Sequence, residues 1–203
     1  RKEKSMILGI TGGIATGKTA VSDILKNLDI KVIDMDIISR EVIKLPKIIQ
    51  SIQNEFGSGV VKNGTVDRKL LREFIFDDKA KVQKLNNIMH PAIIEKAKNE
   101  IDRLKSSTPL IVVVIPLLFE TNLEYLTDSI LLVTADYDKQ VERIMTRDNS
   151  TKTNAENIIA AQMPLSEKVK KSNYVIENNG TYEELKEKVF TFLKTLNYTG
   201  ENL

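Results

Sequence analysis

The sequence predicts an α/β fold in which a doubly wound parallel sheet is covered by helices on both faces. Five short aliphatic runs, bounded by turns, are mostly continuous rather than alternating, which is the pattern of strands buried on both faces. Apolar residues at helical spacing occur between and after these runs. The chain has 203 residues, a length typical of one domain that carries insertions.

The five strands are expected at 6–10, 30–33, 110–115, 129–133 and 174–176. A helix between the first two strands is predicted by the helical spacing of Val21, Ile24, Leu25 and Leu28. A covering helix near the C-terminus is predicted by Leu185, Val189, Phe192, Leu193 and Leu196.

Helical patterns dominate the segment from about 44 to 108. Apolar residues recur there at helical spacing in three groups, for example Ile48, Ile52 and Phe56 in the first. We interpret this segment as a helical insertion between strands. A second interruption, 147–156, is polar and has no apolar periodicity, which is typical of a mobile loop, and lids are built from such segments.

The composition excludes several classes of protein. The net charge is only +2, and without a local basic cluster it does not predict a nucleic-acid partner. The absence of cysteine excludes disulfides, thiolate metal sites and a cysteine nucleophile, and it fits the cytoplasm. The longest apolar run, 110–119, contains Pro116 and is shorter than the roughly 20 residues of a membrane-spanning helix.

A phosphate-binding motif lies between the first strand and the first helix. Gly12, Gly17, Lys18 and Thr19 match G-x-x-x-x-G-K-[ST]. Glycines at these positions let several backbone N–H groups point at one anion at a helix N-terminus. We expect Lys18 to neutralise β- and γ-phosphate charge and the Thr19 hydroxyl to bind Mg²⁺. The flanking strand and helix disfavour the alternative of a chance glycine-rich turn.

Two carboxylates follow the second strand. Asp34 and Asp36 share one face if the extended conformation continues. Ligands of α/β sheets bind at the carboxyl ends of strands, where a carboxylate orients Mg²⁺ or accepts a proton from an acceptor hydroxyl. An ordinary aspartate, with a pKa of about 3.9, is already ionised near neutrality. Alternatively, both acids are turn or N-cap residues of the following helix.

Two arginines, Arg143 and Arg147, are four residues apart on a helical stretch and therefore share one face. If they face the phosphates, they stabilise charge on the transferring group. The alternative is surface ion pairs with the neighbouring acids Asp138, Glu142 and Asp148.

Two further residues are weaker candidates. His90, the single histidine, precedes Pro91 at an expected helix start, so a structural role is favoured over proton transfer. Glu120 follows the third strand, where it either binds substrate or ends the strand with a polar residue.

Several motifs, taken in order, resemble the dephospho-CoA kinase family. They are "GITGGIATGKT" at 9–19, "VIDMD" at 32–36 followed by Arg40, "GTVDR" at 64–68, "MHP" at 89–91, "IPLLFE" at 115–120, Gln140 with Arg143 and Arg147, "AAQMP" at 160–164 and "VIENNG" at 175–180. The phosphate loop is shared by a vast superfamily. The aspartate pair, the run that ends in Glu120 and the Asn-Asn-Gly tail are much more particular.

The resemblance implies ATP-dependent phosphorylation of the ribose 3′-hydroxyl of dephospho-CoA, which yields CoA and ADP in the last step of CoA biosynthesis. It implies a three-layer α/β/α P-loop NTPase core with a five-stranded parallel sheet over 6–43, 109–142 and 165–203. A helical CoA-binding insertion at 44–108 and a lid at 143–164 complete the expected division. ATP, Mg²⁺ and dephospho-CoA are the expected ligands, with no nucleic acid or membrane, in a monomer or small homo-oligomer.

The resemblance also assigns residues. The family's candidate base, the second aspartate of its Asp-x-Asp motif, falls to Asp36, so the expected catalytic set is Asp36, Lys18, Arg143 and Arg147. The nucleotide is expected to contact Gly12, Gly13, Ile14, Ala15, Thr16, Gly17, Lys18, Thr19, Ala20, Asn178 and Gly180. The acceptor is expected to contact Asp34, Asp36, Arg40, His90, Leu118 and Glu120.

The chain departs from the family's pattern at two places. Ala15 and Thr16 stand where the family usually has Gly-Ser, and Ala15 cramps the loop only if that position needs a positive φ. Ser172 and Asn173 stand where the family has Ala-Asp, and we assign Asn173 no function.

Two other functions would use the same phosphate loop. A kinase for a nucleoside, a nucleotide or a small alcohol shares the loop and the lid, but the long helical insertion suits a larger acceptor. A nucleotide-dependent switch would need the guanine-reading Asn-Lys-x-Asp, which the chain lacks. An AAA-like ATPase would need an acid directly at the end of a strand such as 110–115, and that run leads into Pro116 instead.

Overall fold

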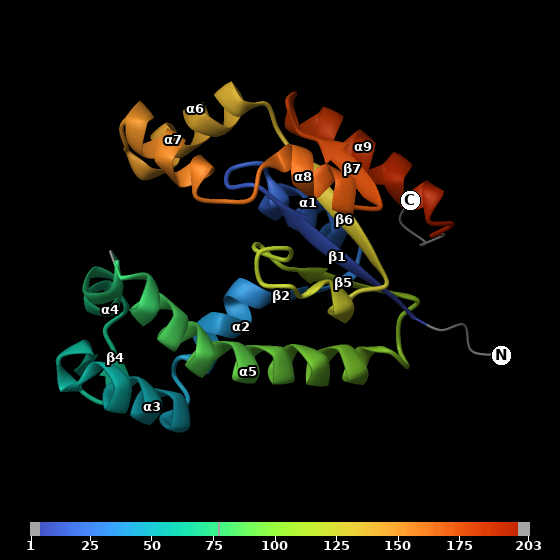
Figure 1. Ribbon diagram of the computed structural model, residues 1–203. Coiled ribbons are helices and arrows are strands. Elements are labelled where there is room, and N and C mark those ends of the chain that lie inside the picture. The colour runs from blue at the N-terminus through green and yellow to red at the C-terminus, as the bar shows by residue number, and fades with distance from the viewer. Residues whose placement is uncertain (1–4, 77, 199–203) are drawn as a thin grey trace. The chain divides into compact units, whose positions relative to one another are not determined.

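Figure 1 shows the computed structural model of the chain, which describes residues 5–76 and 78–198. Two compact units are distinguished. One combines the chain up to Asp34 with the chain from Ile101 onward, and the other is Met35–Glu100. The second unit is therefore an insertion in the first. The functional boundaries expected from the sequence, 44–108 for the insertion and 143–164 for the lid, stay predictions.

The first unit is built on a parallel sheet of five strands in the order β2-β5-β1-β6-β7. The strands are β1 (Met6–Gly12), β2 (Lys31–Asp34), β5 (Leu110–Val114), β6 (Ser129–Thr134) and β7 (Tyr174–Glu177). All five strands predicted from the aliphatic runs are confirmed. Because β1 lies in the middle, between β5 and β6, the chain leaves its carboxyl end at the centre of the edge where α/β proteins bind ligands.

The helices of this unit are α1 (Lys18–Asn27), α6 (Tyr137–Asp148), α7 (Lys152–Ala160), α8 (Leu165–Lys171) and α9 (Tyr182–Thr195), together with the 3₁₀ turn η2 (Glu124–Leu126). Helices α1, α8 and α9 contact strands of the sheet, whereas α6 and α7 pack mainly against each other. Side chains of α1 and α9, such as Leu25 and Leu193, form one buried cluster with strand residues such as Leu8 and Val112. The two helices expected from apolar spacing are thus confirmed, and the apolar residues that predicted them face the sheet.

The second unit is mainly helical. Its elements are α2 (Met35–Val42), α3 (Pro46–Phe56), the 3₁₀ turn η1 (Ser58–Val60), β3 (Val61–Lys62), β4 (Thr65–Val66), α4 (Arg68–Ile75) and α5 (Lys79–Leu104), whose last turn belongs to the first unit. Ile52, Leu71 and Met89 are buried within it. In the part of the chain that the structure describes, no helix combines the length and the apolar character needed to cross a membrane.

Strands β3 and β4 form an antiparallel hairpin that the sequence analysis did not predict. Its turn residues Asn63 and Gly64 have φ of 50° and 73°, and positive φ at both positions is what a type I′ turn requires. Asn-Gly is a strong hairpin signal, so the information was present in the sequence. After the hairpin, Asp67 caps α4, and the hydrogen bond from the Leu70 backbone contributes most to lowering the pKa of this carboxyl group.

The expectation that Pro91 starts a helix is wrong. Pro91 lies inside α5, although proline lacks the N–H that a helix interior uses and crowds the carbonyl four residues before it. Ile93 and Ala97, which lie one turn apart on the same face of α5 just after the proline, are buried.

The expectation of a loop at 147–156 is also wrong. Helix α6 extends to Asp148 and α7 begins at Lys152, so only a short turn separates them. The Thr151 hydroxyl caps α7 by accepting a hydrogen bond of 3.2 Å from the Asn154 backbone N–H, and Ala155 is completely buried. A helix with one small buried residue leaves little periodicity for sequence reasoning to detect.

Candidate active site

The phosphate loop connects β1, which ends at Gly12, to α1, which begins at Lys18. Gly17 caps the helix with φ of 100°, a conformation that residues with a Cβ rarely adopt. A Cβ at Gly17 would also lie 2.1 Å from Nδ2 of Asn178. The second glycine of the motif is therefore required both by its backbone conformation and by its surroundings.

Ala15 also has a positive φ, 58°. This is the condition under which the alanine was expected to cramp the loop. For an L-residue other than glycine, this region costs about 1–2 kcal/mol. The family's usual glycine at this position would avoid the cost, so the loop of this chain stores local backbone strain beside the phosphate site.

The side chains of the loop are ordered by its own carbonyl groups. The Lys18 ammonium donates to the Gly13 carbonyl at 2.8 Å and to the Gly12 carbonyl at 3.4 Å. The Thr16 hydroxyl, which is completely buried, donates to the Gly13 carbonyl at 3.0 Å. Thr19 lies in the first turn of α1 and is exposed, so its hydroxyl is accessible to a ligand.

Two glutamines bind the backbone N–H and C=O of Ile14. The Gln140 side chain, from α6, donates to the Ile14 carbonyl at 2.6 Å, and the Gln162 side chain accepts from the Ile14 N–H at 2.9 Å. Both belong to motifs that carry the family resemblance, although neither was among the expected site residues. A pocket of about 570 Å³ adjoins the loop here, lined by Gly13, Gln140 and residues of 159–165.

The second half of the loop is contacted by Arg143 and Asn178. Arg143 donates to the carbonyl of Ala15 at 3.2 Å and to the carbonyl of Asn178 at 2.8 Å. The buried Asn178 side chain donates to the Thr16 carbonyl at 2.9 Å. The structure thus brings Arg143 and Asn178 into contact with the phosphate loop; the sequence predicted Arg143 near the transferring phosphate, and the resemblance implied that Asn178 lies near the adenine.

Arg147 is placed differently. Its guanidinium donates two hydrogen bonds to the Asp148 carboxylate, at 2.7 and 2.8 Å, and more than half of the side chain is exposed. This bond is the main cause that raises the pKa of Arg147 and lowers that of Asp148. For Arg147 the structure therefore contains the alternative contact, a surface ion pair with Asp148.

Gly180 and Asn173 lie near the last strand. Gly180 precedes Thr181, the cap of α9, and a Cβ there would lie 1.9 Å from Glu184 Oε2, which takes part in the capping box. Asn173 Oδ1 accepts a hydrogen bond of 2.8 Å from the Ile130 N–H. This bond joins the start of β7 to β6, so Asn173 has a structural contact in place of the family's aspartate.

The two aspartates of the Asp-x-Asp motif lie at the end of β2 and just beyond it. Asp34 is the last residue of the strand and pairs in register with Val114. Asp36 is exposed in the first turn of α2 and Arg40 is exposed in the last turn. Because α2 begins at Met35, Asp36 is inside the helix rather than at its N-cap. Residues four apart on a helix share a face, so Asp36 and Arg40 point to the same side.

Leu118 and Glu120 follow β5. The Leu118 side chain is completely buried, so it packs within the core. Glu120 Oε1 accepts from the Lys168 ammonium at 2.7 Å and from the Met163 N–H at 3.1 Å. Its Oε2 is buried and, among the described residues, finds no hydrogen-bond partner. Lys168 was not anticipated, because a lysine on a short polar helix carries no signal of burial.

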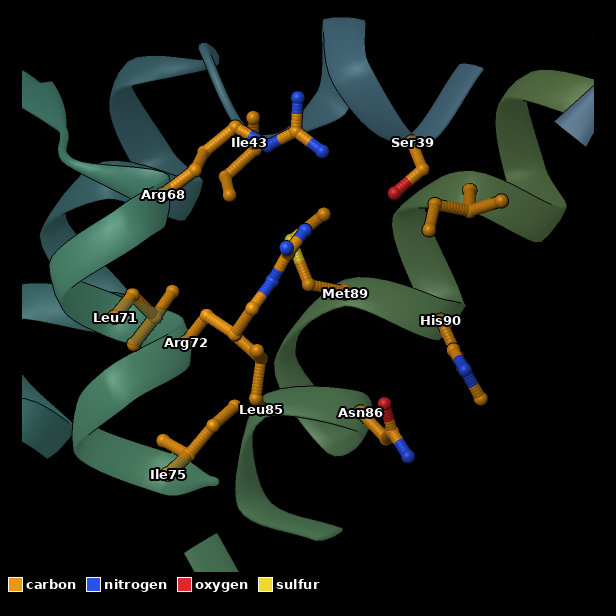
Figure 2. A pocket seen from close by; sticks show the side chains of 11 residues that line it. Ser39, Ile43, Arg68, Leu71, Arg72, Ile75, Leu85, Asn86, Met89 and His90 are labelled. Carbon is orange, nitrogen blue, oxygen red and sulfur yellow. The ribbon is translucent and has the colours of Figure 1, made fainter. Parts of the chain in front are cut away.

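The second unit has a groove of its own, of about 270 Å³, between side chains of α2, α4 and α5 (Figure 2). Arg68 and Arg72 lie four residues apart on α4, and Met89 and Ile93 form part of an apolar wall. Within residues 5–76 and 78–198, neither guanidinium forms an ion pair. His90 also lines the groove, and its partial burial lowers its pKa, which favours the neutral imidazole. Arg68 and Arg72 were not among the expected site residues, although their spacing on one helix face was a usable signal.

A glycine-rich loop that joins the central strand of a parallel sheet to the following helix defines the P-loop class of nucleotide-binding proteins. The family model described as "Dephospho-CoA kinase" matches residues 6–184. The chain belongs to the dephospho-CoA kinase family, whose known reaction is the final step of CoA biosynthesis.

Similar proteins agree with this membership. A dephospho-CoA kinase of Fusobacterium nucleatum is 40% identical over 192 residues, which cover 94% of this chain and 98% of that protein. The crystal structure of TT1252 from Thermus thermophilus has a TM-score of 0.83 at 31% identity and covers 96% of this chain and 99% of that chain. Dephospho-CoA kinase from Campylobacter jejuni has a TM-score of 0.74 at 26% identity, with 94% and 96% covered.

Proposed function

We propose that this chain binds ATP with the loop 12–19, uses Asp36 to accept the proton of the ribose 3′-hydroxyl of dephospho-CoA, and holds the rest of this acceptor in the groove of the second unit. The observation that carries the proposal is the phosphate loop itself: Gly17 caps α1, Lys18 lies against the loop carbonyls and Arg143 contacts Ala15, and these are the residue types that a phosphoryl-transfer site uses. The family membership then supplies the acceptor.

On the nucleotide side, the loop N–H groups and Lys18 hold the β- and γ-phosphates. Lys18 has to give up its bonds to the Gly12 and Gly13 carbonyls to do so. Arg143, which contacts the Ala15 carbonyl, neutralises charge on the transferring phosphoryl group. Arg147 contributes in the same way only after its ion pair with Asp148 breaks. Asn178 and Gly180 border the adenine side of the site.

On the acceptor side, the 3′-oxygen attacks the γ-phosphorus, its proton passes to the Asp36 carboxylate, and ADP leaves. Asp36 is exposed and follows Asp34, the last residue of a core strand, by two positions. Arg40, on the same side of α2, neutralises the acceptor's own phosphate charge. Positioning and charge neutralisation supply most of the catalysis in such a reaction.

Mg²⁺ fits the donor set of the loop. The exposed Thr19 hydroxyl is a hard oxygen ligand at the phosphate site. No group of three or more His, Cys, Asp or Glu that could hold a metal is found among the described residues, and nucleotide-bound Mg²⁺ needs only one or two protein ligands beside phosphate and water. Held by Thr19, the ion would supply positive charge that neutralises the phosphates.

The groove of the second unit suits the remaining part of dephospho-CoA. Arg68 and Arg72 match a diphosphate, since guanidinium groups bind phosphate oxygens in pairs. The apolar wall formed by Met89 and Ile93 suits the pantetheine arm, and neutral His90 can donate or accept a hydrogen bond there. Glu120 can reach the acceptor only through Oε2, because Oε1 is already bonded to Lys168 and Met163.

The decisive test is ADP formation from Mg-ATP with dephospho-CoA, compared with adenosine, a nucleoside monophosphate, pantothenate and no acceptor. We expect only dephospho-CoA to stimulate turnover and to gain the mass of one phosphate. Preferred phosphorylation of a nucleoside or nucleotide would overturn the acceptor assignment and leave the ATP site standing. Slow ATP hydrolysis without any phosphorylated product would favour a nucleotide-dependent switch.

The same proposal places the enzyme in the cytoplasm as a monomer or small homo-oligomer, without a nucleic-acid or membrane partner. The cysteine-free composition and the net charge of +2 support this placement. Light scattering at micromolar concentration, with and without ATP, measures the oligomeric state.

A further inference from the structure

Lys168, on α8, is completely buried. Its ammonium lies 2.7 Å from Glu120 Oε1, and the Glu120 side chain is 21% exposed. Fully buried lysines are rare because the ammonium loses its hydration, and pairing with a carboxylate offsets only part of that cost. Such a pair is a weak source of stability, so its position in the molecule is the better guide to what it does.

The pair lies directly against the phosphate loop. The Lys168 ammonium is 3.5 Å from the carbonyl oxygen of Gly12, and the Lys18 ammonium is 3.4 Å from the same oxygen. Two cations thus share one carbonyl group at the start of the loop. The Glu120 carboxylate is the negative group that compensates the charge of Lys168 at this point.

The other end of the pair holds the segment that follows α7. Glu120 Oε1 accepts a hydrogen bond of 3.1 Å from the Met163 N–H. Met163 lines the pocket that adjoins Gly13. The ion pair therefore ties three parts of the first unit together: the start of the loop, the segment after β5 and the segment between α7 and α8.

We propose that Lys168 and Glu120 are positioning residues for phosphoryl transfer, with the loop carbonyl of Gly12 as the group through which they act. When ATP phosphates draw Lys18 away from the Gly12 and Gly13 carbonyls, Lys168 remains as a donor to Gly12. The start of the loop then keeps its conformation, and Met163, which lines the adjoining pocket, stays in place. This inference rests on the proposed ATP site.

A direct contact between Glu120 and the acceptor would change the kinetic constants in a different way. In that case Glu120→Gln raises KM for dephospho-CoA, while Lys168→Met leaves that KM unchanged. If the two residues act as a pair, both substitutions lower kcat and weaken nucleotide binding, and neither selectively raises KM for dephospho-CoA. Their effects are also not additive, because each removes the same arrangement.

The experiment compares the wild-type chain with Lys168→Met, Glu120→Gln and the double variant. Steady-state kinetics give kcat and both KM values. Titration with Mg-ADP measures the affinity of the phosphate loop for nucleotide in the absence of the acceptor. We expect kcat to fall about 10- to 100-fold in each single variant, the scale of a small misplacement in an active site. The double variant, which buries no charge, should fold and should lose no more than Lys168→Met.

A matched control is available on the same helix. Lys170 and Glu167 form an ion pair of the same length, 2.7 Å, with side chains that are 69% and 52% exposed. Lys170→Met and Glu167→Gln should retain wild-type kcat and ADP affinity, because this pair is solvated and touches no part of the loop.

Wild-type kcat and ADP affinity in the folded double variant and in Glu120→Gln would overturn the inference, even if Lys168→Met alone failed to fold. Additive losses, or an effect confined to KM for dephospho-CoA in Glu120→Gln, would overturn it in favour of direct contact. If the wild-type chain does not phosphorylate dephospho-CoA, the acceptor assignment fails. Weaker ADP binding in the variants would then still support the positioning pair, and unchanged binding would remove it.

Discussion

The side-chain amide of Asn178, at the end of β7, donates a 2.9 Å hydrogen bond to the carbonyl of Thr16 in the phosphate loop, 162 positions earlier in the chain. The same amide nitrogen occupies the space into which a Cβ on Gly17 would project. Asn178, which the family resemblance connects with the nucleotide, therefore also shapes the proposed phosphate loop.

The first prediction concerns Gly17→Ala, which we expect to weaken Mg-ADP binding by about 10²-fold or more. The new Cβ meets Asn178 at 2.1 Å, and φ of 100° strains any residue other than glycine. Isothermal titration measures the affinity. The double variant Gly17→Ala with Asn178→Ala removes the collision but not the strain, and should recover binding only in part. Wild-type affinity in Gly17→Ala alone would show that the loop does not need this geometry.

The second prediction is that Ala15→Gly stabilises the protein. Ala15 has φ of 58°, and relief of the left-handed conformation is worth about 1 kcal/mol, which corresponds to a Tm increase of about 2–4 °C in a chain of this size. Calorimetry without ligand measures the change. Ala20→Gly in α1 is the control, because glycine inside a helix should lower Tm. A Tm of Ala15→Gly below that of the wild type would show that the backbone at Ala15 is not strained.

The third prediction separates the two arginines. Arg143→Lys should lower kcat about 10- to 100-fold, because a single ammonium cannot bond the Ala15 and Asn178 carbonyls as the guanidinium does. Arg147→Lys should lower kcat by a smaller factor, since this side chain is bonded to Asp148 and not to the loop. The measurement is kcat at saturating ATP and dephospho-CoA. An equal or larger loss in Arg147→Lys would mean that Arg147 reaches the phosphates during the reaction.

The fourth prediction is that Asp36→Asn lowers kcat by about 10² or more, the usual contribution of a general base, and leaves Mg-ADP affinity nearly unchanged. Asparagine has nearly the same shape but does not accept the proton of the 3′-hydroxyl. Single-turnover measurements isolate the chemical step from product release. A single-turnover rate near that of the wild type would remove Asp36 from this role.

The fifth prediction concerns the groove of the second unit. Arg68→Met and Arg72→Met should each raise KM for dephospho-CoA about 10-fold or more, with KM for ATP unchanged, because each removes a charged donor to phosphate. Lys69→Met is the matched control on the same helix, since the Lys69 side chain is 86% exposed and does not line the groove. Unchanged KM for dephospho-CoA in both arginine variants would exclude the groove as the acceptor site.

Local pattern was enough to predict the elements of the core. The aliphatic runs predicted the central strands β1, β5 and β6 because a strand buried on both faces has to be apolar at nearly every position. The edge strands β2 and β7 are partly exposed, and their short aliphatic runs were still sufficient to predict them. The loop was predicted because phosphate binding at a helix N-terminus needs glycine at given spacings. The Asn63-Gly64 hairpin could have been predicted in the same way, since its turn is encoded in two adjacent residues.

Contacts between distant segments were decided by the tertiary structure. Lys168 reads as a surface residue in the sequence, yet packing against Glu120 and Gly12 buries it completely. Arg143 and Arg147 have the same chemistry and the same helical face in the sequence, and only the fold separates the one at the loop from the one paired with Asp148. Sequence by itself determined the strands and the phosphate loop, because each depends on residues close together in the chain, and the family, because its short motifs occur in order along the chain. Which side chains meet at the loop depends on how segments more than a hundred residues apart pack, and no local pattern encodes that.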